Sequence, residues 1–192
     1  EEESITTGSR EACLQAACDR FYGRHESRND IAEELESYYV EKGGFLRRED
    51  LAGHVTTIEE PITAEYRDHT ICKCGPWTQG PALCQAMRLL DGFDMKAMGA
   101  HSADAIHHAA EALKLAFADR DAYYGDPQFA GVPLPALLSE RYTKLRRPLI
   151  DPQRASDVIR PGDPYRMESL ATAGHSPPSP GGTTTCVIAD RW

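Results

Sequence analysis

The strongest helical pattern in this chain lies in residues 102–124, which read SADAIHHAAEALKLAFADRDAYY. Ser102 is a residue type that caps helix starts, and Gly125-Asp126-Pro127 ends the pattern because Gly and Pro stop helices. Apolar side chains recur along this stretch at helical spacing, at Ile106, Ala109, Ala110, Leu113 and Phe117. The stripe predicts a long helix that packs at the centre of the fold.

Weaker helical patterns precede and follow this stretch. An Ala-rich helix is predicted from Ser9 to about Phe21, and a second one opens at Ser27 and stops at Gly43-Gly44, with Asp30 in its first turn as in a capping box. Further helices are predicted at 48–52, at 80–91 and at 135–146. In the helix at 80–91, Leu83, Met87 and Leu90 share one face and Pro81 occupies the first turn.

Two regions depart from the helical pattern. Between Val55 and Cys74 the residues are β-branched and alternate in polarity, which predicts a small hairpin near 55–74. From Asp151 to Gly182 the residues Pro, Gly, Ser and Asp recur without periodicity, which predicts a flexible, exposed linker over 151–182. The chain is therefore predicted to be a mostly helical α+β fold, with residues 1–150 as its helical part.

Composition limits the functions that this chain can have. Its 192 residues are 41% hydrophobic and 27% charged, with a formal net charge of −9, and no stretch is long and apolar enough to span a membrane. The acidic balance argues against a nucleic-acid partner, and the short basic run 144–147 is typical of a helix C-terminus. Six irregularly spaced cysteines favour a reducing compartment such as the cytoplasm. The start, Glu1-Glu2-Glu3-Ser4, has no Met and no signal segment and indicates a cut or trimmed end, so a periplasmic or secreted location stays open.

One motif near the end of the chain offers a nucleophile. Residues 180–190 read PGGTTTCVIAD, a Pro/Gly lead-in followed by hydroxyls and an apolar segment. A Thr hydroxyl becomes a good nucleophile when its own α-amine is freed beside it as a base, which requires cleavage of the preceding bond. Gly182-Thr183 suits such a cleavage because Gly tolerates strained backbone. The alternative is a β-strand whose Thr and Val residues reflect strand propensity alone.

Several motifs together resemble one known family. They are Gly43-Gly44-Phe45-Leu46, Gly75-Pro76-Trp77-Thr78-Gln79-Gly80-Pro81, Leu90-Asp91-Gly92-Phe93-Asp94, and the stretch 110–121 with Gly125-Asp126-Pro127. In order and spacing they resemble the later part of the large subunit of the gamma-glutamyltranspeptidase family, over nearly the whole chain from about Ala12 to Asp190. The resemblance implies an N-terminal-nucleophile hydrolase with an αββα sandwich, made as one precursor that cleaves itself into two subunits.

The resemblance also assigns roles to residues. Thr183 falls on the position that becomes the first residue of the small subunit, so 183–192 would be that subunit's first strand and Gly182-Thr183 the cleavage junction. The freed Thr183 would attack a γ-glutamyl amide such as glutathione, and water or an amino acceptor would resolve the acyl-enzyme, with no cofactor. Thr184 and Asp190 fit the family pattern, whereas Thr185 stands where many members have His. The substrate-gripping residues are expected outside this chain, which would need the rest of its precursor and be inactive alone.

Other interpretations of the motifs are weaker. His101, His107 and His108 with Cys72 and Cys74 lack the spacing of known metal motifs, so no metal site is predicted. The run Asp119-Arg120-Asp121 is interpreted as a solvated or salt-bridged helix end. Two alternative functions stay open: a related acylase or amidohydrolase acting on another small amide, and a non-catalytic helical module used for packing.

Overall fold

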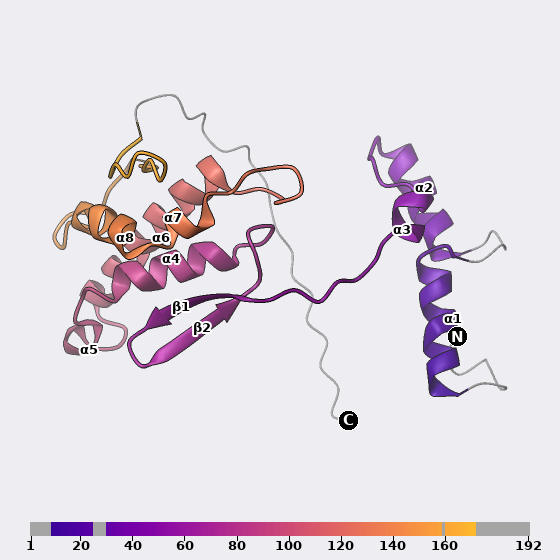
Figure 1. Ribbon diagram of the computed structural model, residues 1–192, viewed down its shortest axis with the longest axis horizontal. Helices are drawn as coiled ribbons and strands as arrows, with labels where there is room; N and C mark the ends of the chain where they lie inside the picture. The colour runs from indigo at the N-terminus through magenta and orange to yellow at the C-terminus, as the bar shows by residue number, and fades with distance from the viewer. Residues whose placement is uncertain (1–8, 25–29, 159, 172–192) are drawn as a thin grey trace. The chain divides into compact units, whose positions relative to one another are not determined.

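The computed structural model describes residues 9–24, 30–158 and 160–171 (Figure 1). The chain divides into two compact units, Glu1–Ile58 and Glu59–Trp192. This boundary differs from the sequence prediction, which placed residues 1–150 in one helical part. The described chain is mostly helical with one small sheet, so the predicted α+β class is confirmed.

The first unit contains helices α1 (Arg10–Phe21), α2 (Ile31–Glu41) and α3 (Arg48–Ala52). Helix α2 begins later than predicted, because Asp30 is its N-cap and its carboxylate accepts the Glu33 amide at 2.8 Å. The same carboxylate pairs with Arg48 of α3, also at 2.8 Å. Gly43 follows α2 with a φ of 74°, a left-handed conformation that ends the helix at the predicted place. Ser27, the predicted cap, lies outside the described residues.

The second unit begins with the predicted hairpin. Strands β1 (Ile62–Tyr66) and β2 (His69–Lys73) are antiparallel, with Ala64 opposite Ile71. Arg67, in the tight turn between them, has a φ of 54°. The hairpin lies along helix α4 (Gly80–Leu90), where Tyr66 packs against the main core (Figure 1).

The core forms where α4 crosses α6 (Ala103–Tyr123). Its centre consists of small and branched side chains from both helices, together with Ile150: Ala82, Ala86, Leu89, Leu90, Ala112, Leu115 and Ala116. Alanines at a helix–helix contact let the two backbones approach closely, so that leucines from each helix can interdigitate.

The buried face of α6 differs from the predicted apolar stripe. Ile106 is 60% exposed and Phe117 is 38% exposed, whereas the buried positions include Glu111 and Asp119. Leu113 and Ala109 only flank the core. The prediction failed because it assumed that the bulkiest apolar residues face inward, but the inward face carries alanines and two charged side chains that find partners.

The remaining elements of the second unit are short. They are α5 (Met95–Met98), α7 (Leu134–Leu137), α8 (Glu140–Arg146) and a 3-10 turn at Arg147–Leu149. The predicted single helix at 135–146 is split at Ser139, whose hydroxyl donates to the Ala136 carbonyl and accepts the Tyr142 amide. Arg147 then donates to the carbonyls of Arg88 and Leu89 at the end of α4. Together α8 and its following turn hold the C-terminal end of α4 in place.

The part of the chain after Ile150 is attached to the second unit at several points, although more than half of its described residues are exposed. We name residues 151–158 and 160–171 the anchored segment. It folds back over α6 and α8 (Figure 1), and its Pro164 is fully buried. The predicted linker is therefore exposed over much of this range, but it is attached to α6 and α8, which the sequence did not predict. Residues 172–182 lie outside the described residues. Composition misled the prediction because the segment is held by polar contacts to its main chain, which need no apolar periodicity.

Candidate functional site

The predicted cleavage junction lies outside the described residues. Gly182, Thr183 and the predicted strand 183–192 are not described, and neither are Thr184, Thr185 and Asp190. The described chain that leads toward them ends at Ala171. The candidate site that can be analysed is therefore the set of side chains that fixes the anchored segment to α6 and α8.

Asp119 of α6 lies at the centre of this set. Its Oδ1 accepts the Gly162 amide at 2.8 Å and an Arg146 Nη2 at 3.1 Å, while its Oδ2 accepts Gln85 Nε2 at 2.5 Å. The Asp119 and Arg146 side chains are both 0% exposed. Burial raises the pKa of the Asp119 carboxyl, against the opposing effects of Arg146 and the Gly162 amide. Asp119 thus joins α4, α6, α8 and the anchored segment.

Arg146 of α8 donates mainly to backbone. Its Nη1 donates to the Ser169 carbonyl at 2.6 Å, and its Nη2 donates to the carbonyls of Arg160 at 2.5 Å and Leu115 at 3.3 Å. A guanidinium has several donors in a fixed planar arrangement, so one side chain can hold two separate points of a loop. The sequence analysis assigned this residue to a helix C-terminal turn; its position in α8 agrees, but its buried partners were missed.

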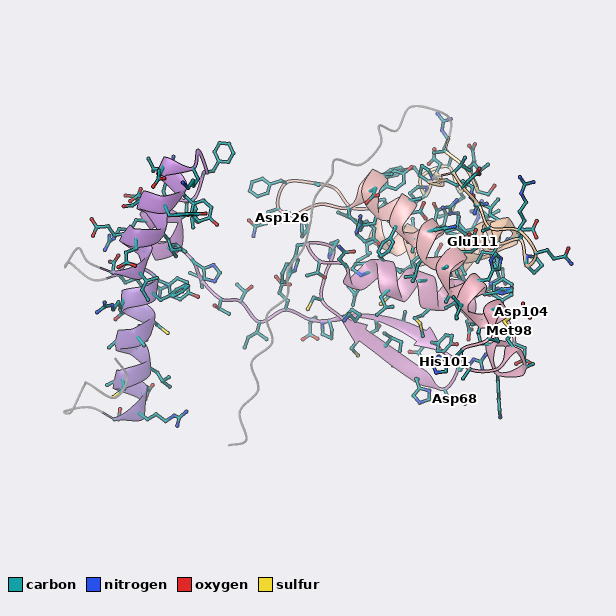
Figure 2. The ribbon with its side chains drawn as sticks, turned by 180° about the vertical axis from the view of Figure 1, so that it is seen from behind. Asp68, Met98, His101, Asp104, Glu111 and Asp126 are labelled. Atoms are coloured by element: carbon teal, nitrogen blue, oxygen red, sulfur yellow. The ribbon has the colours of Figure 1, made fainter. Side chains whose placement is uncertain are left out.

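Glu111 forms a second attachment on α6 (Figure 2). Its Oε1 accepts the Ser156 amide at 3.1 Å and pairs with Lys114 at 2.7 Å, and its Oε2 pairs with Arg160 at 3.1 Å. Burial alone would raise the pKa of Glu111, but Lys114, the Ser156 amide and Arg160 together lower it. Arg160 also donates to the Leu149 carbonyl at 2.8 Å. Two carboxylates of one helix therefore bind two points of the anchored segment.

The end of the anchored segment closes on itself beside Asp119. Asp163 and Glu168 exchange two backbone hydrogen bonds of 3.0 Å, and the Ala171 amide donates to the Pro161 carbonyl at 2.8 Å. Tyr123 of α6 donates its hydroxyl to the Gly162 carbonyl at 2.7 Å. Ala171, the last described residue, is therefore hydrogen-bonded to Pro161. Pro161 directly precedes Gly162, whose amide donates to Asp119.

The chemistry of these side chains favours anchoring over catalysis. Asp119 and Glu111 each accept from a backbone amide and from a cationic side chain, which stabilises a fixed arrangement of charges. A general base, by contrast, must have a lone pair within reach of a substrate proton. The interpretation of Asp119-Arg120-Asp121 as a solvated or salt-bridged helix end fits the exposed Asp121 and its ion pair with Arg120. Asp119 is salt-bridged as well, but it is buried and not solvated.

Two of the three histidines considered for a metal site have other partners. His107 Nε2 lies 2.7 Å from the Asp151 carbonyl, and His108 Nδ1 lies 2.8 Å from the Asp104 carbonyl. The His108 ring also packs edge-on against Phe93. Within residues 9–24, 30–158 and 160–171, no three His, Cys, Asp or Glu side chains are grouped as metal ligands. In the same ranges, no helix combines the length and the apolarity needed to cross a bilayer.

The sequence analysis missed the anchoring residues, although a signal for them exists. Glu111 and Asp119 are eight positions apart, which places them on one face of a helix, among the alanines 112, 116 and 118. A helix face of small residues packs closely against its neighbours, so charged side chains on that face become buried. A buried charge needs a partner, so such residues indicate buried ion pairs. Nothing local in the sequence, however, identifies Arg146, Arg160 or the Gly162 amide as the partners.

Comparison with known proteins places this chain in a family. The family model for gamma-glutamyltranspeptidase matches residues 14–192. The chain is 37% identical to the glutathione hydrolase proenzyme of Escherichia coli (strain K12) over 82% of its own length and 27% of that protein. It is also 36% identical to the acylase ACY 1 proenzyme of Pseudomonas sp. (strain SE83), over 71% of the chain and 24% of the relative.

A solved structure agrees with these matches. The gamma-glutamyltranspeptidase of Helicobacter pylori aligns with 80% of this chain and 44% of that protein's chain, at 30% identity and a TM-score of 0.65. The chain therefore belongs to the gamma-glutamyltranspeptidase family. It spans about a quarter of the length of the curated relatives it matches.

Proposed function

We propose that this chain is part of a gamma-glutamyltransferase or glutathione hydrolase precursor that cleaves itself at Gly182-Thr183. The observation that carries the proposal is that the family match extends through residue 192 and so includes Gly182 and Thr183. Relatives with similar sequences are named proenzymes, a word for precursors that must be processed. The lead-in of Gly and the run of three hydroxyl residues fit a cleavage of this kind.

The chemistry proposed for maturation uses only the chain itself and water. The Thr183 hydroxyl attacks the Gly182 carbonyl carbon, its proton passes to the departing Thr183 nitrogen, and the C–N bond breaks to leave an ester. Water then hydrolyses the ester, which restores the hydroxyl and leaves a free α-amine on Thr183. That amine is the base that activates the same hydroxyl for attack on a γ-glutamyl amide, and water or an amino acceptor takes up the acyl group.

The rest of the precursor is the proposed partner of this chain. An αββα sandwich needs strands beyond those described, and the chain spans only about a quarter of its curated relatives. Side chains that grip the substrate and stabilise the oxyanion are proposed to lie outside it. The isolated chain is therefore proposed to be inactive.

A second candidate function is supported by one comparison. An acylase proenzyme is nearly as similar to this chain as the glutathione hydrolase is, so a different small amide is the alternative acyl donor. Thr185, which stands where many family members have His, lies near the nucleophile and bears on this choice. Hydrolysis of a γ-glutamyl anilide, compared with an acyl anilide that lacks the α-amino and α-carboxyl groups, separates the two candidates.

The test of the proposed function uses the full-length precursor. Mass spectrometry should find a new chain that begins at Thr183 without any added protease. Thr183→Ala should abolish both this cleavage and the amide hydrolysis, while the control Thr184→Ala should retain part of the cleavage. A Thr183→Ala precursor that matures at this bond and stays active would refute the nucleophile assignment and favour the non-catalytic helical module.

A further inference from the structure

We propose that Asp119 and Glu111 are positioning residues for maturation, acting through the anchored segment. The proposal rests on the proposed function, since it concerns the rate at which Gly182-Thr183 is cleaved. It states that the two carboxylates fix the point from which the chain runs toward the junction. The two carboxylates do not contact the Gly182-Thr183 bond. They determine the point on the second unit from which the chain leaves toward that bond.

The first argument is the number and placement of the contacts. The side chains of Glu111, Asp119 and Arg146 bind the main chain of the anchored segment at Ser156, Arg160, Gly162 and Ser169. Contacts to amides and carbonyls hold the path of the backbone whatever side chains it carries. Charged groups make the stronger class of hydrogen bond, and their burial keeps water from replacing them.

The second argument is where these contacts end. The Ala171 amide is bound to the Pro161 carbonyl, next to the Gly162 amide that Asp119 accepts. Ile150 is the last residue of the main core before the segment. If the chain were held only at Ile150, residues 151–182 could extend about 115 Å, whereas residues 172–182 can extend at most about 40 Å from Ala171.

Thr183 and the Gly182 carbonyl that it attacks are neighbours in the chain, so anchoring does not change their separation. It changes how often the junction meets the part of the precursor that holds it for attack. The local concentration of a tethered group falls roughly as the −3/2 power of tether length, so a threefold shorter tether raises it about fivefold. A fixed exit direction adds to this gain, because the junction must also be presented to that part of the precursor in an orientation that allows attack. Loss of the anchoring should therefore slow maturation by about fivefold or more.

Gly162→Ala tests the anchoring without removing a charge. A Cβ at this position would collide with the Tyr142 hydroxyl and lie 2.9 Å from Arg146 Cδ. Either these buried side chains or the anchored segment must therefore shift. Gly131→Ala is the matched control, because a Cβ there meets nothing within 4 Å in the same unit. Both variants are made in the full-length precursor, and cleavage at Gly182-Thr183 is followed by mass spectrometry over time.

The expected result separates positioning from general damage. Gly162→Ala should mature at least fivefold more slowly than the wild type and Gly131→Ala, yet each mature molecule should retain wild-type kcat/KM for the γ-glutamyl amide. Gly162→Ala with Tyr142→Phe should recover part of the rate, because the added methyl group then meets no hydroxyl. Wild-type cleavage kinetics in Gly162→Ala, with limited proteolysis showing that the segment is released, would overturn the proposal.

A second variant covers the case in which Gly162→Ala does not fold. Glu111→Gln removes the charge pairs with Arg160 and Lys114 but keeps an oxygen acceptor for the Ser156 amide. A folded Glu111→Gln precursor that matures more slowly supports the proposal, and one that matures at the wild-type rate contradicts it. If the wild-type precursor itself is never cleaved at Gly182-Thr183, the proposed function fails, which is a distinct outcome.

Discussion

Each of the two units contains an ion pair between an aspartate and an arginine, and the two pairs differ mainly in burial. In the first unit Arg48 and Asp30 are 2.8 Å apart, and the Arg48 side chain is 26% exposed. In the second unit Arg146 and Asp119 are 3.1 Å apart, and both side chains are 0% exposed. The more exposed pair has the shorter distance, so distance alone does not rank the importance of such pairs.

Burial matters because it decides what happens when one partner is lost. Arg48 can turn its guanidinium toward water if Asp30 is removed, which limits the cost. Arg146 would remain inside the protein as an unpaired charge, which is among the most destabilising changes known for single residues. The first pair supports a helix start, and the second supports the packing of three helices and the anchored segment.

The largest effect is expected for Asp119→Ala. It leaves the Arg146 charge and the Gly162 amide without their acceptor, and we expect a loss of about 3–5 kcal/mol in the free energy of unfolding. Urea denaturation followed by circular dichroism measures this loss. If Asp119→Ala costs no more than Asp30→Ala, the contrast between the two pairs is wrong.

A slightly smaller effect is expected for Leu115→Ala. Leu115 is buried in the core between α4 and α6, so its truncation should cost about 2–5 kcal/mol of unfolding free energy. Leu113→Ala is the matched control on the same helix, and it should cost clearly less because Leu113 only flanks that core. If thermal or urea unfolding shows that both variants lose the same amount of stability, the apolar stripe predicted from the sequence would be the inward face after all.

Asp30→Ala should have a moderate and local effect. It removes the N-cap bond to the Glu33 amide, a change that costs about 0.5–2 kcal/mol. Hydrogen exchange should increase in residues 30–52 of the first unit and stay unchanged in α6. The exposed Ser37→Ala on the same helix is the control, and it should leave exchange within about 0.5 kcal/mol of the wild type. Faster exchange in α6 would contradict the separate behaviour of the two units.

The smallest effect is a difference in acid sensitivity between Glu111 and Asp119. The pKa of Glu111 is lowered in the folded state, so its contribution to stability is complete above its unfolded pKa, about 4.3, and is lost as pH falls through the folded value. The pKa of Asp119 is raised, so the folded state binds its proton more readily and acid does not weaken the fold through this group.

Amide protection factors measured by NMR between pH 5 and pH 3 test this difference. Protection of the Ser156 amide, which Glu111 accepts, should fall before that of the Gly162 amide, which Asp119 accepts. Glu111→Gln should remove the pH dependence at Ser156 and leave the protection at Gly162 unchanged. Simultaneous loss at both amides in the wild type would show that the two attachments open as one.

The sequence predicted much of the local structure because local structure depends on neighbouring residues. The hairpin, the start of α4 at Gly80 with Pro81, and the extent of α6 all follow from turn, cap and propensity signals within a few residues. The errors arose where a cap competed with its neighbours. Asp30, and not Ser27, starts α2, and Ser139 divides the last predicted helix.

The face of α6 and the state of residues 151–171 could not be predicted in the same way. Both depend on partners far along the chain: Gln85 and Arg146 for Asp119, and Ser156 and Arg160 for Glu111. A periodicity argument ranks side chains by hydrophobicity, so it places Ile106 and Phe117 inward and the carboxylates outward. A carboxylate can face inward when hydrogen-bond donors of the protein replace the water molecules that it loses on burial, and the ranking by hydrophobicity then fails.

The sequence by itself determined most of the helices and the hairpin, and its motifs alone were enough to indicate the gamma-glutamyltranspeptidase family. Those features depend on short-range sterics, hydrogen bonding along the chain, and residues kept in a fixed order. Only the tertiary structure decided that a Pro- and Gly-rich stretch is bound to α6 and α8. Its attachment depends on a few buried charged side chains meeting specific backbone amides and carbonyls, and that complementarity exists only when distant parts of the chain are packed together.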